Sequence, residues 1–418
     1  MDVEIITVGD ELLIGQVVDT NSAWMGKALN EYGFQAVRRT AVGDVEKDIF
    51  AAMDEAKGRV SLVLLTGGLG PTRDDITLRT LCRYFDCRLH FSAEVYADIE
   101  QMFRSRGREV NALTRLQAMT PDGCTVIRNR AGTAPCTWFE REDFVLVSMP
   151  GVPSEMKWLM THEVLPRLAE RFRRDAHILH RTYWVRDYTE SELAMRLSGF
   201  EDELPPSVKL AYLPQAGAIR LRLSACSPQE AVAAEAMAVS RKQLESLLEG
   251  HIFAEEDKNI EAIVGERLRK QGSTVGTAES CTGGAIAALL TSIAGSSDYF
   301  VGSVVSYANT VKQHVLGVSG EDLRQHGAVS REVVEQMAQG ALRVLGCDYA
   351  IAASGIAGPG GGTPEKPAGA IWIAVAGSDG VTSRYHRFGA VREQNIQRTT
   401  MMALLLLLEI LDKKETGI

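Results

Sequence analysis

The sequence has few of the features that mark disulfide-stabilised, membrane-spanning or nucleic-acid-binding proteins. Its seven cysteines include no CxxC pair, which argues against a zinc site or a disulfide framework and fits reduced thiols. Its most apolar run, residues 404–408, is far shorter than the ~20 residues that a membrane span needs. The formal net charge of −9 lacks the basic excess of a general nucleic-acid binder. The chain starts in a strand-like run at residues 3–8 without a signal segment, so we expect a cytoplasmic protein with neither membrane nor nucleic acid as partner.

What the sequence does contain is the composition of a globular protein long enough for two or three cores. Apolar residues make up 45% and charged residues 24% of the 418 positions. Apolar runs alternate with helical patterns in residues 1–170 and again in residues 253–418, which is typical of doubly wound α/β sheets. Residues 171–252 combine alternating strands with a long Ala- and Glu-rich helix. We therefore predict two doubly wound α/β domains joined by a small α+β module.

A glycine-rich stretch follows a buried strand of the first domain. The apolar run of residues 60–65 predicts a central parallel strand, and residues 66–77 (TGGLGPTRDDIT) lead from it into a helix. Glycines let a backbone approach a phosphate closely, and a helix start supplies amides. Carboxylates near this sheet edge, from Asp10, Asp44, Asp74 and Asp75, suit a divalent cation held against that phosphate. The simpler alternative is a glycine-rich turn with an aspartate helix cap.

Four motifs in this domain carry a family resemblance. The segments GDELLIGQVVDTNSAW, TGGLGPTRDDIT, AGTAP and PGVPSEM closely resemble the N-terminal domain of the CinA (competence/damage-inducible) family, which is similar to the molybdopterin-binding MoaB/MogA fold. The resemblance implies nucleotide or pterin binding and, in some members, a metal-dependent ADP-ribose pyrophosphatase activity. It leaves open whether this domain catalyses or only binds. The implied nucleotide site comprises Asp10, Glu11, Gly67, Gly68, Gly70, Asp74 and Asp75, and the implied metal ligands are Asp44 and Asp75.

The middle segment, residues 171–252, offers no ligand motif of its own. Family members carry a small KH-like connecting module at this place, but this segment has no GxxG loop that would indicate RNA binding. Its arginines alternate with apolar residues, as on a half-exposed sheet. We expect a spacer or assembly element.

A hydroxyl and a thiol lie together in the third domain, in residues 277–284 (TAESCTGG). This stretch follows a short apolar run, residues 273–276, and precedes a helical run, residues 285–290, which predicts a strand-to-helix turn. The first amides of the helix would stabilise negative charge there. Lys312 follows Ser280 by 32 residues, near the end of another strand, which supplies a Ser–Lys nucleophile–base pair. The plain alternative is a capped turn with a buried cysteine.

Two choices at this site stay open from the residues alone. Cys281 rivals Ser280 as nucleophile because thiolates attack more readily, but no histidine accompanies it in the motif, which favours Ser280. The loop of residues 354–364, with five glycines, is read either as a phosphate or ribose cradle or as a flexible flap.

The third domain also resembles a known family. The segments AESCTGG, GSS, YANTVK, HGAVS and SGIAGPGGGTPEKPAG, with a final Arg-bearing helix, resemble the nicotinamide mononucleotide deamidase (PncC-type) domain of CinA proteins. The resemblance implies hydrolysis of the carboxamide of nicotinamide mononucleotide, with release of ammonia and no metal. The implied catalytic residues are Ser280, Lys312, Tyr307 and Ser297. The expected oxyanion donors are the amides of Cys281, Thr282 and Gly283, and the expected substrate-binding residues are Asn309, Gly355, Ala357, Gly358, Arg392 and Arg398.

Two classes of function therefore remain. The first is an enzyme of pyridine-nucleotide recycling, which acts on nicotinamide mononucleotide and, through its first domain, on ADP-ribose or a related nucleotide. The second is a nucleotide-sensing or partner-binding protein linked to competence or DNA damage. The presence of both Ser280 and Lys312 favours the enzyme. A small module between two α/β domains further suggests a homodimer.

Overall fold

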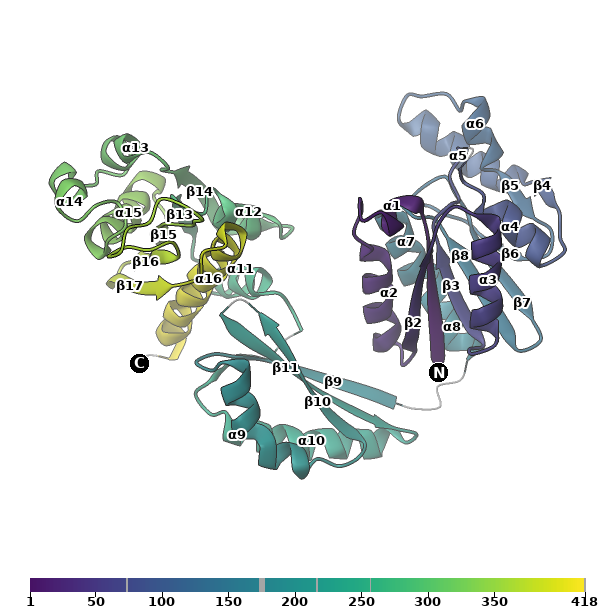
Figure 1. Ribbon diagram of the computed structural model, residues 1–418, viewed down its shortest axis with the longest axis horizontal. Coiled ribbons are helices and arrows are strands. Elements are labelled where there is room, and N and C mark those ends of the chain that lie inside the picture. Colours follow the sequence, from purple (N-terminus) through teal and green to yellow (C-terminus); the bar gives the residue numbers. More distant parts are fainter. Residues whose placement is uncertain (73, 173–176, 216, 256, 417–418) are drawn as a thin grey trace. The chain divides into compact units, whose positions relative to one another are not determined.

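The computed structural model describes residues 1–72, 74–172, 177–215, 217–255 and 257–416 (Figure 1). Arg73 of the expected phosphate loop lies outside these residues. The chain divides into two compact units: residues 1–179 with 226–234, and residues 180–225 with 235–418. Most of the middle segment therefore belongs to the same unit as the C-terminal α/β fold.

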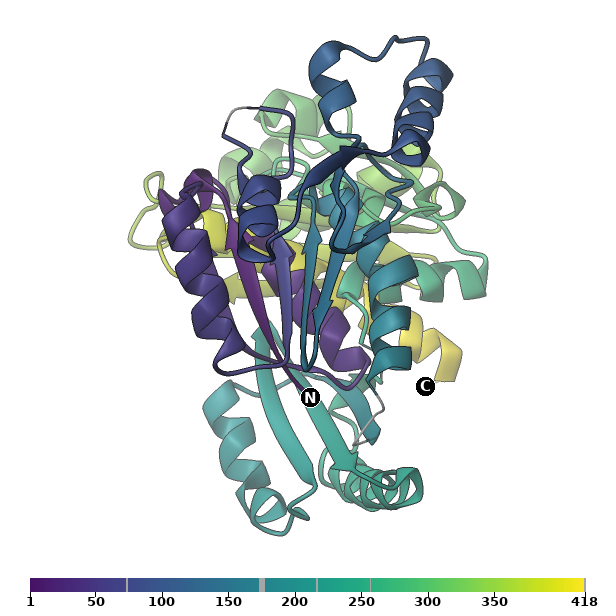
Figure 2. The same cartoon turned by 90° about the vertical axis from the view of Figure 1, so that its right-hand side faces the viewer.

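The first unit is built on a six-stranded sheet of order β2-β1-β3-β8-β7-β6. Its first four strands are parallel, whereas β7 and β6 add an antiparallel edge. Figure 2 shows these strands, coloured purple to teal, side by side between helices. The strands are β1 (Asp2–Val8), β2 (Gln35–Val42), β3 (Leu62–Thr66), β6 (Thr125–Ile127), β7 (Cys136–Arg141) and β8 (Phe144–Met149).

Both faces of this sheet are buried, because alternate residues of each central strand enter different cores. Helices α2 and α7 pack on one face of the sheet, against Val3, Ile5, Leu62 and Leu64. Helices α3 and α4 pack on the other face, against the alternate residues of the same strands, such as Ile6. This arrangement confirms the predicted doubly wound fold. The helices of the unit are α1 (Asp10–Leu13), α2 (Thr20–Glu31), α3 (Glu46–Lys57), α4 (Thr77–Tyr84), α5 (Ala93–Ser105), α6 (Ala112–Leu116), α7 (Pro153–Leu159), η1 (Met160–Val164) and α8 (Leu165–Arg171), and a two-stranded sheet joins β4 (Leu89–Phe91) to β5 (Met119–Pro121).

The middle module forms a four-stranded sheet of order β10-β11-β9-β12 with two helices. Its alternating strands bury one face only, as in β11, where Ile219, Leu221 and Leu223 are buried. The elements are β9 (His177–Val185), α9 (Glu190–Asp202), β10 (Val208–Gln215), β11 (Ala218–Ser227), α10 (Glu230–Leu247) and β12 (Ile252–Ala254).

The C-terminal α/β fold has a five-stranded sheet of order β14-β13-β15-β16-β17. Strands β14, β13 and β15 are parallel, and β16 and β17 continue the sheet in antiparallel fashion. The strands are β13 (Val275–Glu279), β14 (Phe300–Val305), β15 (Tyr349–Gly355), β16 (Ala370–Gly377) and β17 (Gly380–Arg387). The helices are α11 (Ile260–Gln271), α12 (Ala285–Thr291), η2 (Ser296–Asp298), α13 (Asn309–His314), α14 (Gly320–Gln325), α15 (Arg331–Leu345) and α16 (Arg392–Thr416).

The two faces of this sheet carry side chains of different size. Val275, Ile351 and Ile373 pack against α11, α12 and α16, whereas small residues such as Ala350 and Ala352 pack against α15. The alanines let α15 lie close to the sheet. The apolar run at residues 404–408 lies in α16, where most of its leucines are buried, so it belongs to the core. Among the described residues, the helices are too short or too polar to cross a bilayer.

Candidate active site

The hydroxyl of Ser280 lies at the carboxyl end of β13, an inner strand of the C-terminal sheet. Strand β13 runs to Glu279, three residues beyond the apolar run that predicted it, so the turn begins at Ser280. The amide of Ser280 donates to the carbonyl of Ala353 in the neighbouring strand β15 at 3.0 Å, which fixes the start of the turn. The turn then leads into α12, as predicted.

Lys312 reaches this hydroxyl from α13. Its Nζ lies 3.0 Å from Oγ of Ser280, 2.6 Å from the carbonyl oxygen of Ser306 and 3.4 Å from that of Tyr307. The side chain is 1% exposed, and burial lowers the pKa of Lys312 below that of a free lysine. The structure thus brings the two residues of the predicted pair into direct contact.

The contacts of Nζ allow both the charged and the neutral form of the amine. A neutral lysine has two N–H groups and one lone pair. With Lys312 protonated, Nζ donates to Ser280 Oγ and to the carbonyls of Ser306 and Tyr307. Once the amine is neutral, which its lowered pKa favours, the two carbonyls can take its two N–H groups and the lone pair can accept the Oγ–H of Ser280. An uncharged lysine in this place is a base aimed at a serine hydroxyl.

Cys281 is not placed to compete with Ser280. Its side chain is buried, and burial raises the pKa of Cys281 to about 12. The thiol therefore stays protonated near neutral pH, and thiols attack poorly in that form. The structure favours Ser280 over Cys281 as nucleophile.

The helix start near Ser280 differs from the prediction, because a carboxylate occupies it. Glu279 is fully buried, and its carboxylate accepts hydrogen bonds from the amides of Gly284, Ile286 and Ala287 at 2.8 to 3.0 Å. The expectation that these amides are free to stabilise negative charge on a ligand is wrong. Glu279 instead fixes the turn that carries Ser280. The sequence motif contained this residue without revealing its role, because its partners lie five to eight positions ahead.

Two of the three expected oxyanion donors remain available. The amide of Gly283 donates to the carbonyl of Ser280 within the turn at 3.2 Å, so its assignment as an oxyanion donor is corrected. The amides of Cys281 and Thr282 bond to no other residue in the described part of the chain. Thr282 Oγ1 is also buried and lacks a hydrogen-bond partner within the described ranges, so it is a further donor beside the nucleophile.

Several predicted substrate-binding residues come together next to Lys312. Arg392, the first residue of α16, donates to the hydroxyl of Tyr307 at 3.1 Å and to the carbonyl of Gly358 at 3.4 Å. Tyr307 is 60% exposed, so its ring faces solvent at the edge of the site. Asn309 begins α13, one turn before Lys312, and is exposed. Gly355, at the end of β15, leads into the loop that contains Ala357 and Gly358.

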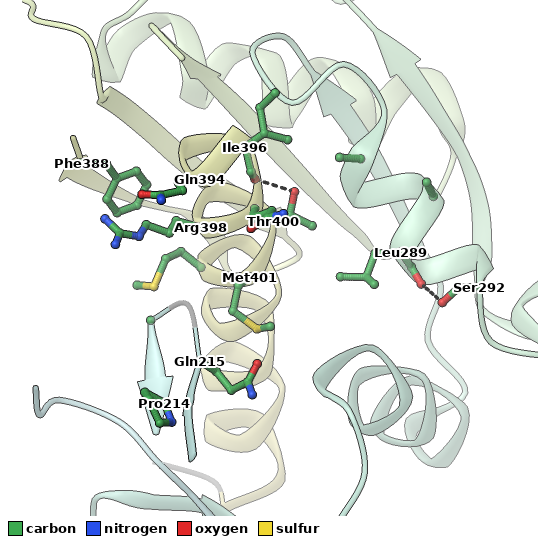
Figure 3. A pocket seen from close by; sticks show the side chains of 15 residues that line it. Pro214, Gln215, Leu289, Ser292, Phe388, Gln394, Ile396, Arg398, Thr400 and Met401 are labelled. Atoms are coloured by element: carbon green, nitrogen blue, oxygen red, sulfur yellow. Dashed lines mark hydrogen bonds between the residues drawn. The ribbon is translucent and has the colours of Figure 1, made fainter. Parts of the chain in front are cut away.

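Ser297 lies at the opposite sheet edge from the pair, so its catalytic assignment is wrong for a single chain, whereas the substrate-binding assignment of Arg398 stays a prediction. Ser297 lies in η2, before β14, whereas Ser280 follows the parallel strand β13 at the opposite edge of the sheet. Arg398 lines a different cleft of about 1030 Å³ between α12, α16 and the β10–β11 turn. Figure 3 shows its side chain beside Phe388, whose ring centre is 5.9 Å from the guanidinium carbon.

The first unit gathers a second group of predicted residues at the carboxyl edge of its sheet. The amide of Asp10 donates to Asp44 Oδ2 and the amide of Asp44 donates to Asp10 Oδ1, both at 3.1 Å. Asp75 accepts hydrogen bonds from the amide of Thr72 at 2.8 Å and from its hydroxyl at 2.5 Å. A Cβ at Gly68 would lie 3.4 Å from Asp44 Oδ1, so the glycine loop passes directly beside this carboxylate.

The electrostatics of this edge favour a cation. Burial raises the pKa of Asp44, and the charges of Asp10, Glu11 and Asp75 raise it further. Asp74 is exposed and is not among the charges that act on Asp44. Gly68, Gly70 and Asp75 line a cavity of about 130 Å³, and the amide of Gly67 bonds to the carbonyl of Met149 at 3.1 Å.

The carboxylate oxygens at this edge are suitable ligands for a magnesium-like ion. In the described residues, no group of three or more His, Cys, Asp or Glu side chains is arranged around one metal position. Mg²⁺ is usually held by one or two carboxylates together with phosphates and water, so the carboxylates of Asp44 and Asp75 beside the glycine loop suit it.

Comparison with known proteins covers nearly the whole chain. Residues 4–170 match the probable molybdopterin binding domain, residues 180–254 the damage-inducible protein CinA KH domain, and residues 257–411 the CinA C-terminal domain. CinA-like proteins of Cytophaga hutchinsonii and Flavobacterium psychrophilum are 44% and 40% identical, over 96% and 97% of this chain and the same shares of their own. A solved structure of competence/damage inducible protein CihA from Agrobacterium tumefaciens is 40% identical over 37% of this chain and 97% of its own, with a TM-score of 0.35. With two relatives matched at this identity over almost their full length, the chain belongs to the CinA family.

Proposed function

We propose that the protein hydrolyses nicotinamide mononucleotide to nicotinate mononucleotide and ammonia. One observation carries the proposal: the buried Nζ of Lys312 lies 3.0 Å from Oγ of Ser280, and burial lowers the pKa of Lys312. A serine with a neutral lysine beside it is a general device for acyl transfer, and a carboxamide is an acyl donor.

In the first step Ser280 Oγ attacks the carboxamide carbon while its proton passes to Nζ of Lys312. The negative charge moves to the carboxamide oxygen, where the amides of Cys281 and Thr282 would receive it. Lys312, now an ammonium, gives its proton to the leaving nitrogen. The carbon–nitrogen bond breaks, ammonia departs, and a nicotinoyl ester on Ser280 remains.

In the second step water hydrolyses this ester. Lys312 is neutral again and takes a proton from the water, whose oxygen attacks the ester carbon. The ester bond breaks, Lys312 returns the proton to Ser280 Oγ, and the carboxylate product leaves. Every proton transfer in this scheme uses one lysine held by the carbonyls of Ser306 and Tyr307.

The choice of a mononucleotide rests on the surroundings of the pair and on the resemblance of its motifs to deamidase domains. Arg392 supplies a positive charge next to Tyr307, and the glycine loop at Gly358 supplies closely accessible backbone. Together they suit the phosphate and ribose of a nucleotide whose nicotinamide ring lies over Ser280. Asn309 would line the same opening.

A coupled assay of ammonia release by the full chain tests the proposal. We expect ammonia from nicotinamide mononucleotide with wild-type protein and none above background with Ser280→Ala. If the wild type binds the nucleotide without releasing ammonia, the protein is a nucleotide sensor or partner-binding protein, the second class considered from the sequence.

We propose in addition that the first unit hydrolyses ADP-ribose with a divalent metal. The crowding of Asp10, Glu11, Asp44 and Asp75 beside a glycine loop supports it. Asp44 and Asp75 would hold the ion, which when bound would neutralise charge on the pyrophosphate. The loop amides would orient the phosphates, and the carboxylates would keep the ion against them. Hydrolysis of ADP-ribose by purified protein, with and without Mg²⁺ or Mn²⁺, tests this activity.

We propose that the working form is a cytoplasmic homodimer. The support is the three-part organisation, in which a small module separates two α/β folds. Light scattering at assay concentrations should give twice the mass of the chain, and a monomer mass at the same activity would refute the dimer.

A further inference from the structure

A buried asparagine in the first turn of α16 joins three segments near the site. Asn395 is 1% exposed, and its Nδ2 donates at 2.8 Å to the carbonyl of Ala357 and at 2.8 Å to the carbonyl of Gly389. Two carbonyl acceptors fix which end of the side-chain amide is the nitrogen. Ala357 lies in the glycine loop and Gly389 in the connection between β17 and α16, so one side chain joins both segments to the helix.

The two segments that Asn395 joins meet through their backbones. A Cβ at Gly358, where φ is +89°, would lie 2.6 Å from the carbonyl oxygen of Ala390, and one at Gly369 would lie 2.4 Å from that of Gly389. No side chain from these glycines can hold the loop in place. The two hydrogen bonds of Asn395 span this contact and supply a connection that the glycines lack.

The held loop is connected to the proposed catalytic pair. Arg392, one turn before Asn395, donates to the carbonyl of Gly358 and to the hydroxyl of Tyr307. The carbonyl of Tyr307 in turn accepts from Nζ of Lys312 at 3.4 Å. A continuous series of contacts therefore leads from Asn395 through the loop and Arg392 to the base.

The hydrogen bonds of this side chain are made by its nitrogen. Its Oδ1 is buried and has no hydrogen-bond partner in the part of the chain that the structure describes. A buried acceptor without a donor disfavours folding. The contacts that Asn395 contributes are therefore those to the two carbonyls that it holds in place.

We propose that Asn395 is a positioning residue that holds the glycine loop and Arg392 in the geometry that receives the phosphate of the substrate. This inference rests on the proposed deamidase function. It makes Asn395 a determinant of the preference for a nucleotide over the corresponding nucleoside. The side chain itself is buried and acts through Ala357, Gly389 and the loop.

Steady-state kinetics with two substrates test the role. Full-length wild type, Asn395→Ala and Asn395→Asp are assayed for ammonia release from nicotinamide mononucleotide and from nicotinamide riboside, which lacks the phosphate. We expect KM for the mononucleotide to rise about tenfold or more with kcat changed less than about threefold, because the lost contact is equally strong in ground and transition states. The kcat/KM for the riboside should stay unchanged.

Thr400→Val is the matched control. Thr400 lies on the same helix, is buried, and donates to the carbonyl of Ile396 at 2.9 Å, as Figure 3 shows, so its substitution removes a side-chain hydrogen bond from a buried residue of α16. We expect this variant to treat both substrates as the wild type does.

Several outcomes would overturn the proposal. Equal losses with both substrates would make Asn395 a general structural residue, and unchanged KM for the mononucleotide would remove any role in binding. If neither Asn395 variant folds, as judged by circular dichroism, the side chain holds the fold rather than the loop. If the wild type releases no ammonia from the mononucleotide, the deamidase function itself is contradicted. That failure is seen in the wild type alone and is therefore distinct from a failure of the role of Asn395.

Discussion

The carboxylate of Glu279 accepts the amide hydrogen of Ala287 at 2.8 Å, across the turn that carries the nucleophile. Together with its bonds from Gly284 and Ile286, this contact places a buried negative charge at the start of α12. Negative charge at a helix N-terminus is stabilised by the helix dipole. The turn is therefore rigid, and the orientation of Ser280 depends on the residue before it.

Glu279→Gln should weaken both the turn and the reaction. An amide cannot accept three N–H groups with the strength of a carboxylate, so we expect a loss of about 2–3 kcal/mol in the free energy of unfolding. Small displacements of a nucleophile slow a reaction strongly, and we expect kcat/KM to fall about 100-fold. Urea unfolding and ammonia release measure the two effects.

Glu4→Gln is the control for this variant. Glu4 is equally buried and is bonded to Arg59 and Thr40, but it lies in the first unit. Glu4→Gln should lower the free energy of unfolding without changing kcat/KM for deamidation in the folded protein. If Glu279→Gln were as active as Glu4→Gln, the turn would not need its carboxylate.

Cys281→Ala should keep its activity within about threefold of the wild type. Burial raises the pKa of Cys281 to about 12, so its thiol stays protonated at the pH of the assay. Removing the sulfur leaves the amide of residue 281 in place and costs about 1 kcal/mol in stability. Cys347→Ala, a second buried thiol in the same unit, is the control. A Cys281→Ala protein as inactive as Ser280→Ala would reverse the assignment of the nucleophile.

Lys312→Met should be inactive. Its free energy of unfolding at pH 7 should nevertheless exceed that of the wild type by about 1 kcal/mol or more. Burial lowers the pKa of Lys312, which means that the folded state disfavours the ammonium. Between this lowered pKa and the ~10.4 of an unfolded lysine, the unfolded state binds more protons, so wild-type stability rises with pH.

The difference in the free energy of unfolding between wild type and Lys312→Met should accordingly shrink as pH rises from 7 toward 10. Denaturant unfolding at several pH values measures it. A wild type that is clearly more stable than Lys312→Met at pH 7 would show that the fold favours the charged lysine.

Asp44→Asn should lower metal-dependent hydrolysis of ADP-ribose about tenfold or more while leaving deamidation unchanged. Asp44 lies between Asp10 and the glycine loop, and its carboxylate would bind the ion only when ionised. Because burial raises the pKa of Asp44, affinity for the ion should fall as pH drops through that pKa. Calorimetric titration with Mg²⁺ and ADP-ribose measures this change. Asp48→Asn, an exposed carboxylate on α3, should leave both activities intact.

The sequence predicted the α/β architecture and the Ser280–Lys312 contact for the same reason. Unbroken apolar runs identify parallel strands, and the ends of parallel strands meet at one sheet edge, so residues that follow them come together. The alternating strand β17 was not predicted because its polar residues, such as Arg384, resemble those of a surface loop.

The differences between the predicted and the observed site arise from distances that sequence spacing does not encode. The short motif around Ser297 gave no sign that the whole of β14 separates it from the edge that carries Ser280. Arg398 follows Arg392 by six positions, about one and two-thirds helical turns, so the two arginines leave α16 in different directions. The role of Asn395 depends on carbonyls 6 and 38 positions away, which no local pattern reveals.

The central claim is that Lys312 acts as an uncharged base on Ser280, and the pH dependence of kcat/KM in Lys312→Arg tests it most directly. Arginine keeps the positive charge and much of the length but does not lose its proton in this range. The wild-type value should rise with pH through one ionisation below ~10.4, whereas Lys312→Arg should be about 1000-fold slower at every pH and match Ser280→Ala. Substantial turnover by folded Lys312→Arg, with the same pH profile as the wild type, would contradict the account.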